Sequence, residues 1–298
     1  MKKILIATTA LVATAGVAAA DVSLSGSARM GLQYNDNPTN VEDLTLHTRV
    51  RIRIQATGET DGGLTWGAKT RIQAANGSTG TAINSSAVWI GGSWGKLTVG
   101  DTDPAGDDFG ITSWGFANVG GGEAAEASRY TGGSNVRYDG SFGDLTVVAT
   151  LGLSYSNAGD PIDGDYSLGF GYNFGNFAVN LAFDHDELHA ATAAENDSVA
   201  ARISGSFGDV AVGLFVADSD SYGSGWGIDA AYTMGNLTIG ANYSEIDDDN
   251  ALIAGAGDND SYEIGFKYGL GGGATLAGAV GQNSAGDTVA DLGISLKF

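Results

Sequence analysis

The segment from Leu44 to Gly58, LTLHTRVRIRIQATG, decides the fold. Within it, RVRIRI at residues 49–54 alternates three arginines with three aliphatic side chains, and Leu44 and Leu46 continue the aliphatic series. Because successive side chains of an extended chain point to opposite sides, this pattern predicts a β-strand with one cationic and one aliphatic face. The two faces need different environments, so the fold must place a different solvent on each side of the strand.

The first twenty residues, MKKILIATTALVATAGVAAA, have the features of a secretory signal peptide. Lys2 and Lys3 precede an apolar run, and three alanines stand directly before Asp21. The alternative is a membrane-spanning helix. The small residues at the end of the apolar run and the lack of a basic stop signal after it disfavour this alternative. We therefore expect residues 1–20 to be removed and residues 21–298 to form a single domain.

The composition excludes several classes of protein. The 35 acidic residues against 14 basic ones give a formal net charge of −21, and removal of two leader lysines makes it more negative. This balance argues against nucleic-acid binding. The absence of cysteine excludes disulfides and thiolate sites. Aromatic and β-branched residues recur among the 48 glycines, which favours an ordered chain. After the leader, no apolar run approaches the ~20 residues of a spanning helix.

Sixteen segments of the mature chain show strand-like alternation. They are residues 22–34, 44–57, 64–74, 85–92, 95–101, 134–139, 145–155, 166–173, 177–184, 199–205, 210–217, 226–232, 237–244, 262–268, 274–282 and 289–298. The connections between them are alternately short and long. Short links place glycine beside Asn, Asp or Lys, as tight hairpins require. These links are SWGK (93–96), SFGD (141–144), NFGN (173–176), SFGD (206–209) and TMGN (233–236). The pattern predicts an up-and-down meander with turns at one end and loops at the other.

A bulky residue stands before the glycine of each short link. These residues are Trp94, Phe142, Phe174, Phe207 and Met234, and each falls on the aliphatic side of its strand. A ring of this kind is typical of the lipid interface of an outer-membrane barrel, and a soluble sandwich has no need of it. We therefore predict an all-β, 16-stranded antiparallel transmembrane β-barrel. Its aliphatic faces contact lipid, its closure removes unpaired edges, and its arginine face lines a lumen too wide for side chains to fill.

Four segments resemble the trimeric general porins of α-proteobacterial (Rhodobacter-type) outer membranes. They are SARMGLQY at 27–34, the arginine strand, TDGGLTWGAKTRIQ at 60–73 and VADLGISLKF at 289–298. The resemblance implies a homotrimer in the outer membrane of a Gram-negative bacterium, in contact with outer-membrane lipid and lipopolysaccharide. It also implies passive diffusion of small hydrophilic solutes and ions, and a third long loop folded into the lumen. The terminal Phe298 matches the assembly signal of the family.

Basic side chains gather on the lumen side of three neighbouring strands. By the same count of faces they are Arg29, Arg49, Arg51, Arg53, Lys69 and Arg71, and Arg137 on a later strand extends the set. We expect them to line the pore. The alternative is that they pair with carboxylates of neighbouring strands.

The longest connection, residues 102–132, holds the position of the constriction loop of the resembled family. Its carboxylates are Asp103, Asp107, Asp108, Glu123 and Glu126, and its aromatic residues, in FGITSWGFANVGGG at 109–122, are expected to pack it against the wall. A basic wall facing an acidic loop predicts a transverse field that orients polar solutes. Because the acidic excess acts at the mouths of the pore, we expect a weak preference for cations.

No catalytic residue or resident cofactor is expected. HDELH at 185–189 has its glutamate at the wrong place for a metalloprotease motif, so an outer loop is the simpler interpretation. Five loop carboxylates are candidate Ca²⁺ ligands, with simple solubilising charge as the alternative. They are Asp247, Asp248, Asp249, Asp258 and Asp260. An adhesin or structural barrel with a closed lumen is the main alternative function, and an outer-membrane hydrolase is a second.

Overall fold

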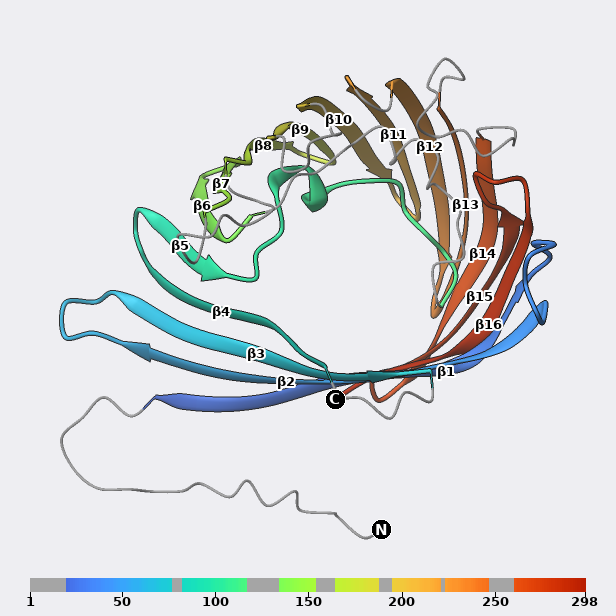
Figure 1. The fold of residues 1–298 in the computed structure, drawn as a ribbon, viewed down its shortest axis with the longest axis horizontal. Coiled ribbons are helices and arrows are strands. Elements are labelled where there is room, and N and C mark those ends of the chain that lie inside the picture. Colours follow the sequence, from blue (N-terminus) through green and yellow to red (C-terminus); the bar gives the residue numbers. More distant parts are fainter. Residues whose placement is uncertain are drawn as a thin grey trace, which may run out of the picture.

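The protein is a closed barrel of sixteen antiparallel strands (Figure 1). The computed structural model describes residues 20–76, 82–116, 134–153, 164–187, 195–220, 223–246 and 260–298. Each strand pairs with its neighbours in sequence, and β1 pairs with β16 to close the ring. This confirms the predicted fold class. No helix in the described part of the chain is long and apolar enough to cross a membrane.

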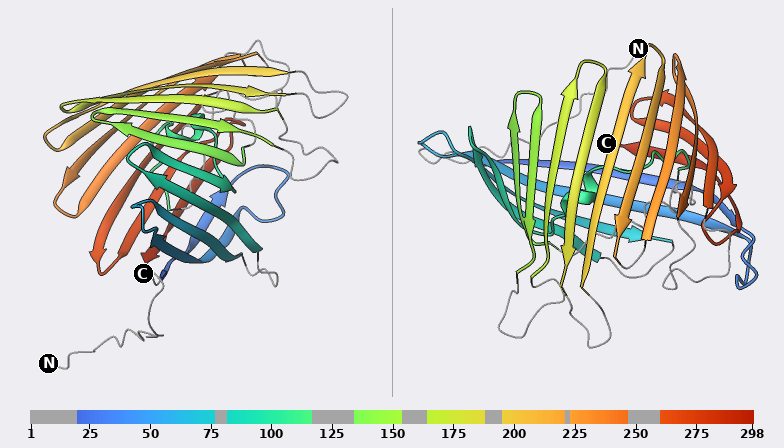
Figure 2. Two further views of the ribbon diagram at one scale, coloured as in Figure 1. Left: turned by 90° about the vertical axis from the view of Figure 1, so that its left-hand side faces the viewer. Right: turned by 90° about the horizontal axis from the view of Figure 1, so that it is seen from above.

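The strands tilt strongly across the wall (Figure 2). The first eight are β1 (Asp21–Asn35), β2 (Leu44–Glu59), β3 (Thr65–Ala75), β4 (Ala82–Gly92), β5 (Gly95–Gly100), β6 (Val136–Phe142), β7 (Leu145–Leu151) and β8 (Tyr166–Phe174). The last eight are β9 (Phe177–Asp186), β10 (Asn196–Phe207), β11 (Val210–Ser219), β12 (Gly223–Met234), β13 (Leu237–Ile246), β14 (Asp260–Gly271), β15 (Ala274–Gln282) and β16 (Thr288–Lys297). One short 3₁₀ helix, η1 (Ala105–Asp108), follows β5.

The short turns have the backbone that their sequences require. Gly143, Gly175, Gly208 and Gly235 have φ between 58° and 66°. A side chain is disfavoured at such angles, whereas glycine adopts them freely, which permits a two-residue hairpin turn. The predicted tight connections are therefore confirmed.

The faces of the strands lie as the alternation predicts. Val50 and Ile52 point outward with exposures of 47% and 39%, whereas His47, on the other face of β2, is only 8% exposed. The bulky turn residues are also exposed on the outside, and Phe177 contacts both Phe174 and Phe207 at ring centroid distances of 5.5 and 5.4 Å. The outer surface thus carries the predicted apolar band, with a ring of large side chains at its turn end.

Most strand boundaries differ from the predicted ones by one to four residues, and β4 and β6 show the local structure at two of them. β4 begins at Ala82 rather than residue 85, because its register against β3 shifts between Lys69 and Arg71 and Ser85 has a φ of +54°. This irregularity interrupts the alternation from which the boundary was predicted. β6 begins at Val136 rather than residue 134, and the Asn135 side chain just before it exchanges hydrogen bonds with the backbone of Leu153.

The segment after β5 enters the barrel. Figure 1 shows it inside the ring of strands, following the inner side of β8–β13. Phe109 and Ile111 of this segment pack against Phe215, Ala200 and Ala217 on the inner faces of β10 and β11. This buried apolar cluster therefore lies between an internal loop and the wall.

Candidate functional site: the inner surface and its loop

The predicted basic residues lie together on the inner faces of β1, β2 and β3. Arg29 is directly opposite Arg49, Arg53 is directly opposite Arg71, and Lys69 is opposite Gln55. Directly opposed like charges destabilise a sheet, and the guanidinium groups of Arg49, Arg51 and Arg71 are near enough to repel one another. We call this set, Arg29, Arg49, Arg51, Arg53, Lys69 and Arg71, the basic wall.

Among the described residues, the hydrogen bonds of the basic wall go to neutral groups. Arg51 donates to the amide oxygen of Gln73, Arg71 donates to that of Asn84 over 2.8 Å, and Arg29 donates to the backbone carbonyl of Phe116 over 3.0 Å. Among the residues that the structure describes, no carboxylate forms an ion pair with any member of the wall. The described strands therefore show no ion pair of the kind that the alternative interpretation requires, although Asp291 of β16 is near enough to Arg29 to attract its charge.

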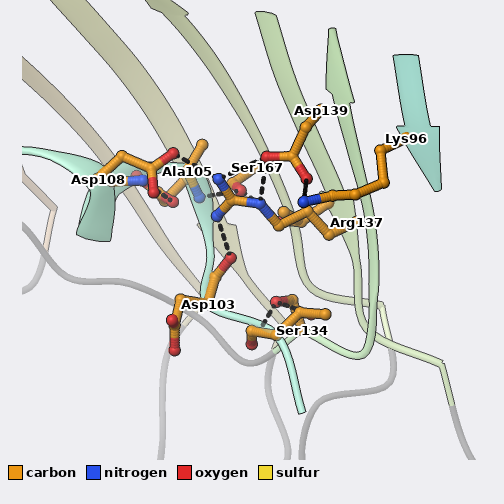
Figure 3. Close-up of polar contacts among 12 residues, drawn as sticks. Lys96, Asp103, Ala105, Asp108, Ser134, Arg137, Asp139 and Ser167 are labelled. Atoms are coloured by element: carbon orange, nitrogen blue, oxygen red, sulfur yellow. Dashed lines mark hydrogen bonds and ion pairs between the residues drawn. The ribbon is translucent and has the colours of Figure 1, made fainter. Parts of the chain in front are cut away.

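Arg137 on β6 has a different environment from the basic wall (Figure 3). Its guanidinium binds the carboxylate of Asp108 over 2.6 Å, that of Asp139 over 2.9 Å and the carbonyl of Asp103 over 2.8 Å. Asp139 also pairs with Lys96 over 3.4 Å. Arg137 faces the lumen as expected, but it does not extend the basic wall, because its charge is matched by one loop carboxylate and one strand carboxylate.

The three described loop carboxylates lie across the lumen from the basic wall. Asp103, Asp107 and Asp108 are exposed around η1, on the side of the barrel formed by β7, β8 and β9. Asp108 is bound to Arg137, and Asp103 contributes its carbonyl oxygen to the same group. Glu123 and Glu126 lie outside the described residues.

Residues 109–116 cross the inner surface toward the basic wall. Their bulky side chains rest on strands that have glycine on the inner face, where an added methyl group would overlap the loop. The contacts are Ile111 on Gly227 of β12, Trp114 on Gly240 of β13 and Gly265 of β14, and Phe116 on Gly293 of β16 and Gly31 of β1. The ring of Phe116 also meets His47 edge to face, at 5.6 Å between centroids. The expectation that aromatic residues pack the loop against the wall is confirmed for Trp114 and Phe116.

Polar groups of β13 and β14 hold the same segment. The carboxylate of Glu263 accepts hydrogen bonds from the backbone amides of Trp114 and Gly115 and from the hydroxyl of Ser113. Lys267 donates to the carbonyl of Ser113 over 2.8 Å and lies over the indole of Trp114 at 5.1 Å. The side chain of Asn242 donates to the carbonyl of Thr112 over 2.8 Å.

Sequence reasoning did not find Glu263, Lys267 or the inner glycines as site residues. A weak signal exists, since Glu263 and Lys267 share one face of a strand and are its charged residues on the lumen side. Their partners are about 150 positions away in the chain, however, so pairing them requires the register of the closed barrel.

Of the five candidate metal ligands, Asp260 alone lies within the described residues. Asp260 lies at the start of β14, within 3.4 Å of the side-chain amide of Gln282, whereas Asp247, Asp248, Asp249 and Asp258 fall outside the described residues. In the described ranges, no group of three or more His, Cys, Asp or Glu side chains is arranged to hold a metal ion. His185 of the HDELH segment pairs with Asp197 over 2.6 Å and stacks on Tyr166.

Comparison with known proteins agrees with this architecture. Residues 7–288 match the family model described as Gram-negative porin. The porin of Fuscovulum blasticum is 28% identical, and that of Rhodobacter capsulatus is 27% identical; each match covers 93% of this chain and all of the relative. A solved variant of Rhodopseudomonas blastica porin superposes with a TM-score of 0.78 at 24% identity, again over 93% of this chain and 100% of that one. A second variant, with two basic and two acidic residues replaced by alanine, gives 0.76 at 25% identity and the same coverage.

The chain belongs to the Gram-negative porin family. It is a multi-pass β-barrel of the outer membrane and a channel for passive diffusion of small solutes, not an enzyme. The family assignment favours the channel over the closed-lumen scaffold and the hydrolase.

Proposed function

We propose that this outer-membrane porin selects solutes at a constriction between the basic wall and the loop that follows β5. The observation that carries the proposal is the contact of Arg29 with the carbonyl of Phe116, which brings the loop to the edge of the basic wall. Solutes that pass the wall meet guanidinium groups that form no ion pair with a described carboxylate. Polar and anionic groups of a solute gain electrostatic stabilisation there. An apolar solute loses part of its hydration and gains no electrostatic interaction in exchange.

The acidic side of the constriction belongs to the loop. The groups that we propose as the source of a field across the lumen are the loop carboxylates Asp103, Asp107, Asp108, Glu123 and Glu126, of which Asp108 is bound to Arg137. The whole chain is acidic, and its loops concentrate negative charge at the outer mouth. We infer weak overall selectivity for cations, because the mouths attract cations over a long range while the basic wall acts locally.

Charge reversal at the centre of the basic wall tests the constriction. In Arg51→Glu we expect single-channel reversal potentials in a salt gradient to move toward stronger cation selectivity, by about several-fold in permeability ratio. Lys96→Glu makes the same change of charge at the turn end of the barrel, beside Asp139, and should shift selectivity less. Equal shifts in the two variants would contradict a local filter at the wall. Firm anion selectivity of the unmodified protein would overturn the predicted cation preference.

A homotrimer is the assembly that we propose, on the strength of the family resemblance. Conductance increments that appear in groups of three in planar bilayers, together with a trimer mass in mild detergent, are the expected results. A protein that is monomeric in both detergent and bilayer would contradict this proposal.

Outer-leaflet lipopolysaccharide is the lipid partner that we propose, bridged by Ca²⁺ to the acidic loop before β14. Support comes from the carboxylates at residues 247–249, 258 and 260 and from Glu245, which is exposed and directly opposite Asp260. Hard divalent ions prefer such oxygen ligands. Equilibrium dialysis should show saturable calcium uptake that is lost in a variant with all five carboxylates amidated. Uptake without saturation would leave only a solubilising role for these groups.

A further inference from the structure

The inner wall has a track of glycines under the loop. Gly227, Gly240, Gly265, Gly293 and Gly31 belong to five strands, and each approaches an atom of Ile111, Trp114 or Phe116 so closely that a Cβ atom would overlap it. Glycine weakens the interior of a strand, and it often marks a place where another chain segment approaches the backbone closely. The bulky residues of the loop therefore sit against bare backbone.

Glu263 makes three of the polar contacts that hold the same segment. Its side chain is fully buried, with 2% of the residue exposed, and both carboxylate oxygens face the loop. A buried carboxylate is stable only when hydrogen bonds replace its hydration. Here the backbone amides of Trp114 and Gly115 and the hydroxyl of Ser113 provide them, and bonds to an ionised acceptor are stronger than those between neutral groups.

We propose that Glu263, together with the glycine track, is the positioning element that fixes the loop on the wall formed by β12–β16 and β1 and thereby sets the width of the open pore. In this view the loop is a rigid part of the constriction, and its position is determined by the barrel. The role in pore width rests on the proposed function, whereas the role in holding the loop does not.

The Arg137 contacts cannot supply this restraint for residues 112–116. They bind Asp103 and Asp108 at the start of the loop, where Asp108 is exposed. Loss of Glu263 would therefore leave Trp114 and Gly115 with buried amides and no acceptor, while the first part of the loop stays attached.

A cysteine reporter measures the position of the loop separately from the pore. The chain has no cysteine, so Thr112→Cys introduces a unique thiol on a half-buried loop residue whose backbone carbonyl accepts the hydrogen bond from Asn242. The rate at which a small charged methanethiosulfonate modifies this thiol, measured from the mass shift of the protein, reports how closely the loop is held against the wall. Single-channel conductance and the swelling of liposomes in sugars of increasing size report the pore. Heat-modifiable migration in detergent gels shows that each variant is folded.

Two variants should release the loop, and two matched variants should not. Glu263→Ala removes the acceptor, and Gly240→Ala places a methyl group inside the indole of Trp114. Each should raise the modification rate by about tenfold or more, as expected for opening of a local element, with noisier current and faster entry of large sugars. Glu263→Gln keeps an amide oxygen that accepts both backbone amides. Gly171→Ala makes the same substitution at an inner-face glycine whose neighbours are the side chains of Thr146 and Asn180 and not the loop. Both should stay near the parent rate.

The outcomes separate the two proposals. Faster modification in Glu263→Ala and Gly240→Ala with unchanged conductance and sugar entry would show that the loop is held as proposed but does not form the constriction. Unchanged modification in Gly240→Ala, or in a folded Glu263→Ala, would overturn the positioning role. Equal acceleration in Glu263→Gln or Gly171→Ala would also overturn it, because any perturbation of the wall would then release the loop.

Discussion

On the inner surface of the barrel, the charged residues of β1–β3 and those of β10–β14 have different kinds of partners. On β1–β3, the arginines face one another and bind amide and carbonyl oxygens. On β10–β14, the charged groups are matched or used by the loop, since Arg202 pairs with Asp229 over 2.6 Å and Glu263 binds three donors of residues 113–115. The same strand alternation thus builds a basic wall, whose charges we propose act on solutes, and a second wall on β10–β14 that holds the loop, which we call the seat.

The difference shows how one barrel meets two demands. The seat must be tightly packed. It therefore uses glycines and the buried carboxylate of Glu263, whose hydrogen bonds are made within the protein. A surface that acts on passing solutes must keep its charges uncompensated, and repulsion among them is tolerated because the outward aliphatic residues fix the register in lipid. Stability and selectivity therefore reside largely in different strands.

The largest effect should come from leaving a charge unmatched on the seat side. Asp229→Asn removes the partner of Arg202 where both side chains are at most 10% exposed. Breaking such a buried pair should cost about 3 kcal/mol, because the remaining guanidinium loses its compensation. The midpoint of urea unfolding in detergent micelles measures this. Asp139→Asn, at a more exposed carboxylate that shares Arg137 with Asp108, is the control and should cost clearly less.

The contrast between the two halves also decides how much the sequence reveals. The strands, their faces and the turns follow from local patterns, so RVRIRI alone indicates which side of β2 carries charge. The ion pairing that distinguishes Arg137 from the basic wall does not follow from a local pattern. Its partner Asp108 lies in a loop, 29 positions away in the sequence. The seat of Trp114 is still less predictable, because it needs Gly240 and Gly265 to be neighbours across β13 and β14. Local alternation predicts the face of a residue, whereas only the closed barrel determines what that face meets.

An intermediate effect is expected where the loop leaves β5. Asp108→Asn weakens the ion pair with Arg137, whose side chains are 43% and 14% exposed. Partial exposure reduces such a pair to about 0.5–1 kcal/mol, and Asp139 remains as a partner. We expect a small loss of stability that shrinks further as salt is raised from 0.05 to about 0.5 M, since ions screen the exposed pair. A loss that does not depend on salt would mean that Asp108 acts through packing and not through its charge.

The smallest change in stability, and the opposite sign, is expected on the basic wall. Arg49→Gln removes one of two guanidinium groups that face each other across β1 and β2, so relief of repulsion should stabilise the barrel by a few tenths of a kcal/mol. The same variant should shift the reversal potential toward cations, because a positive charge has left the wall. Urea midpoints and bilayer recordings on one preparation measure both quantities. A variant that is destabilised by as much as Asp229→Asn would show that Arg49 is needed for folding. Arg49 would then contribute to stability as the residues of the seat do, and the proposed division between the seat and the basic wall would be wrong.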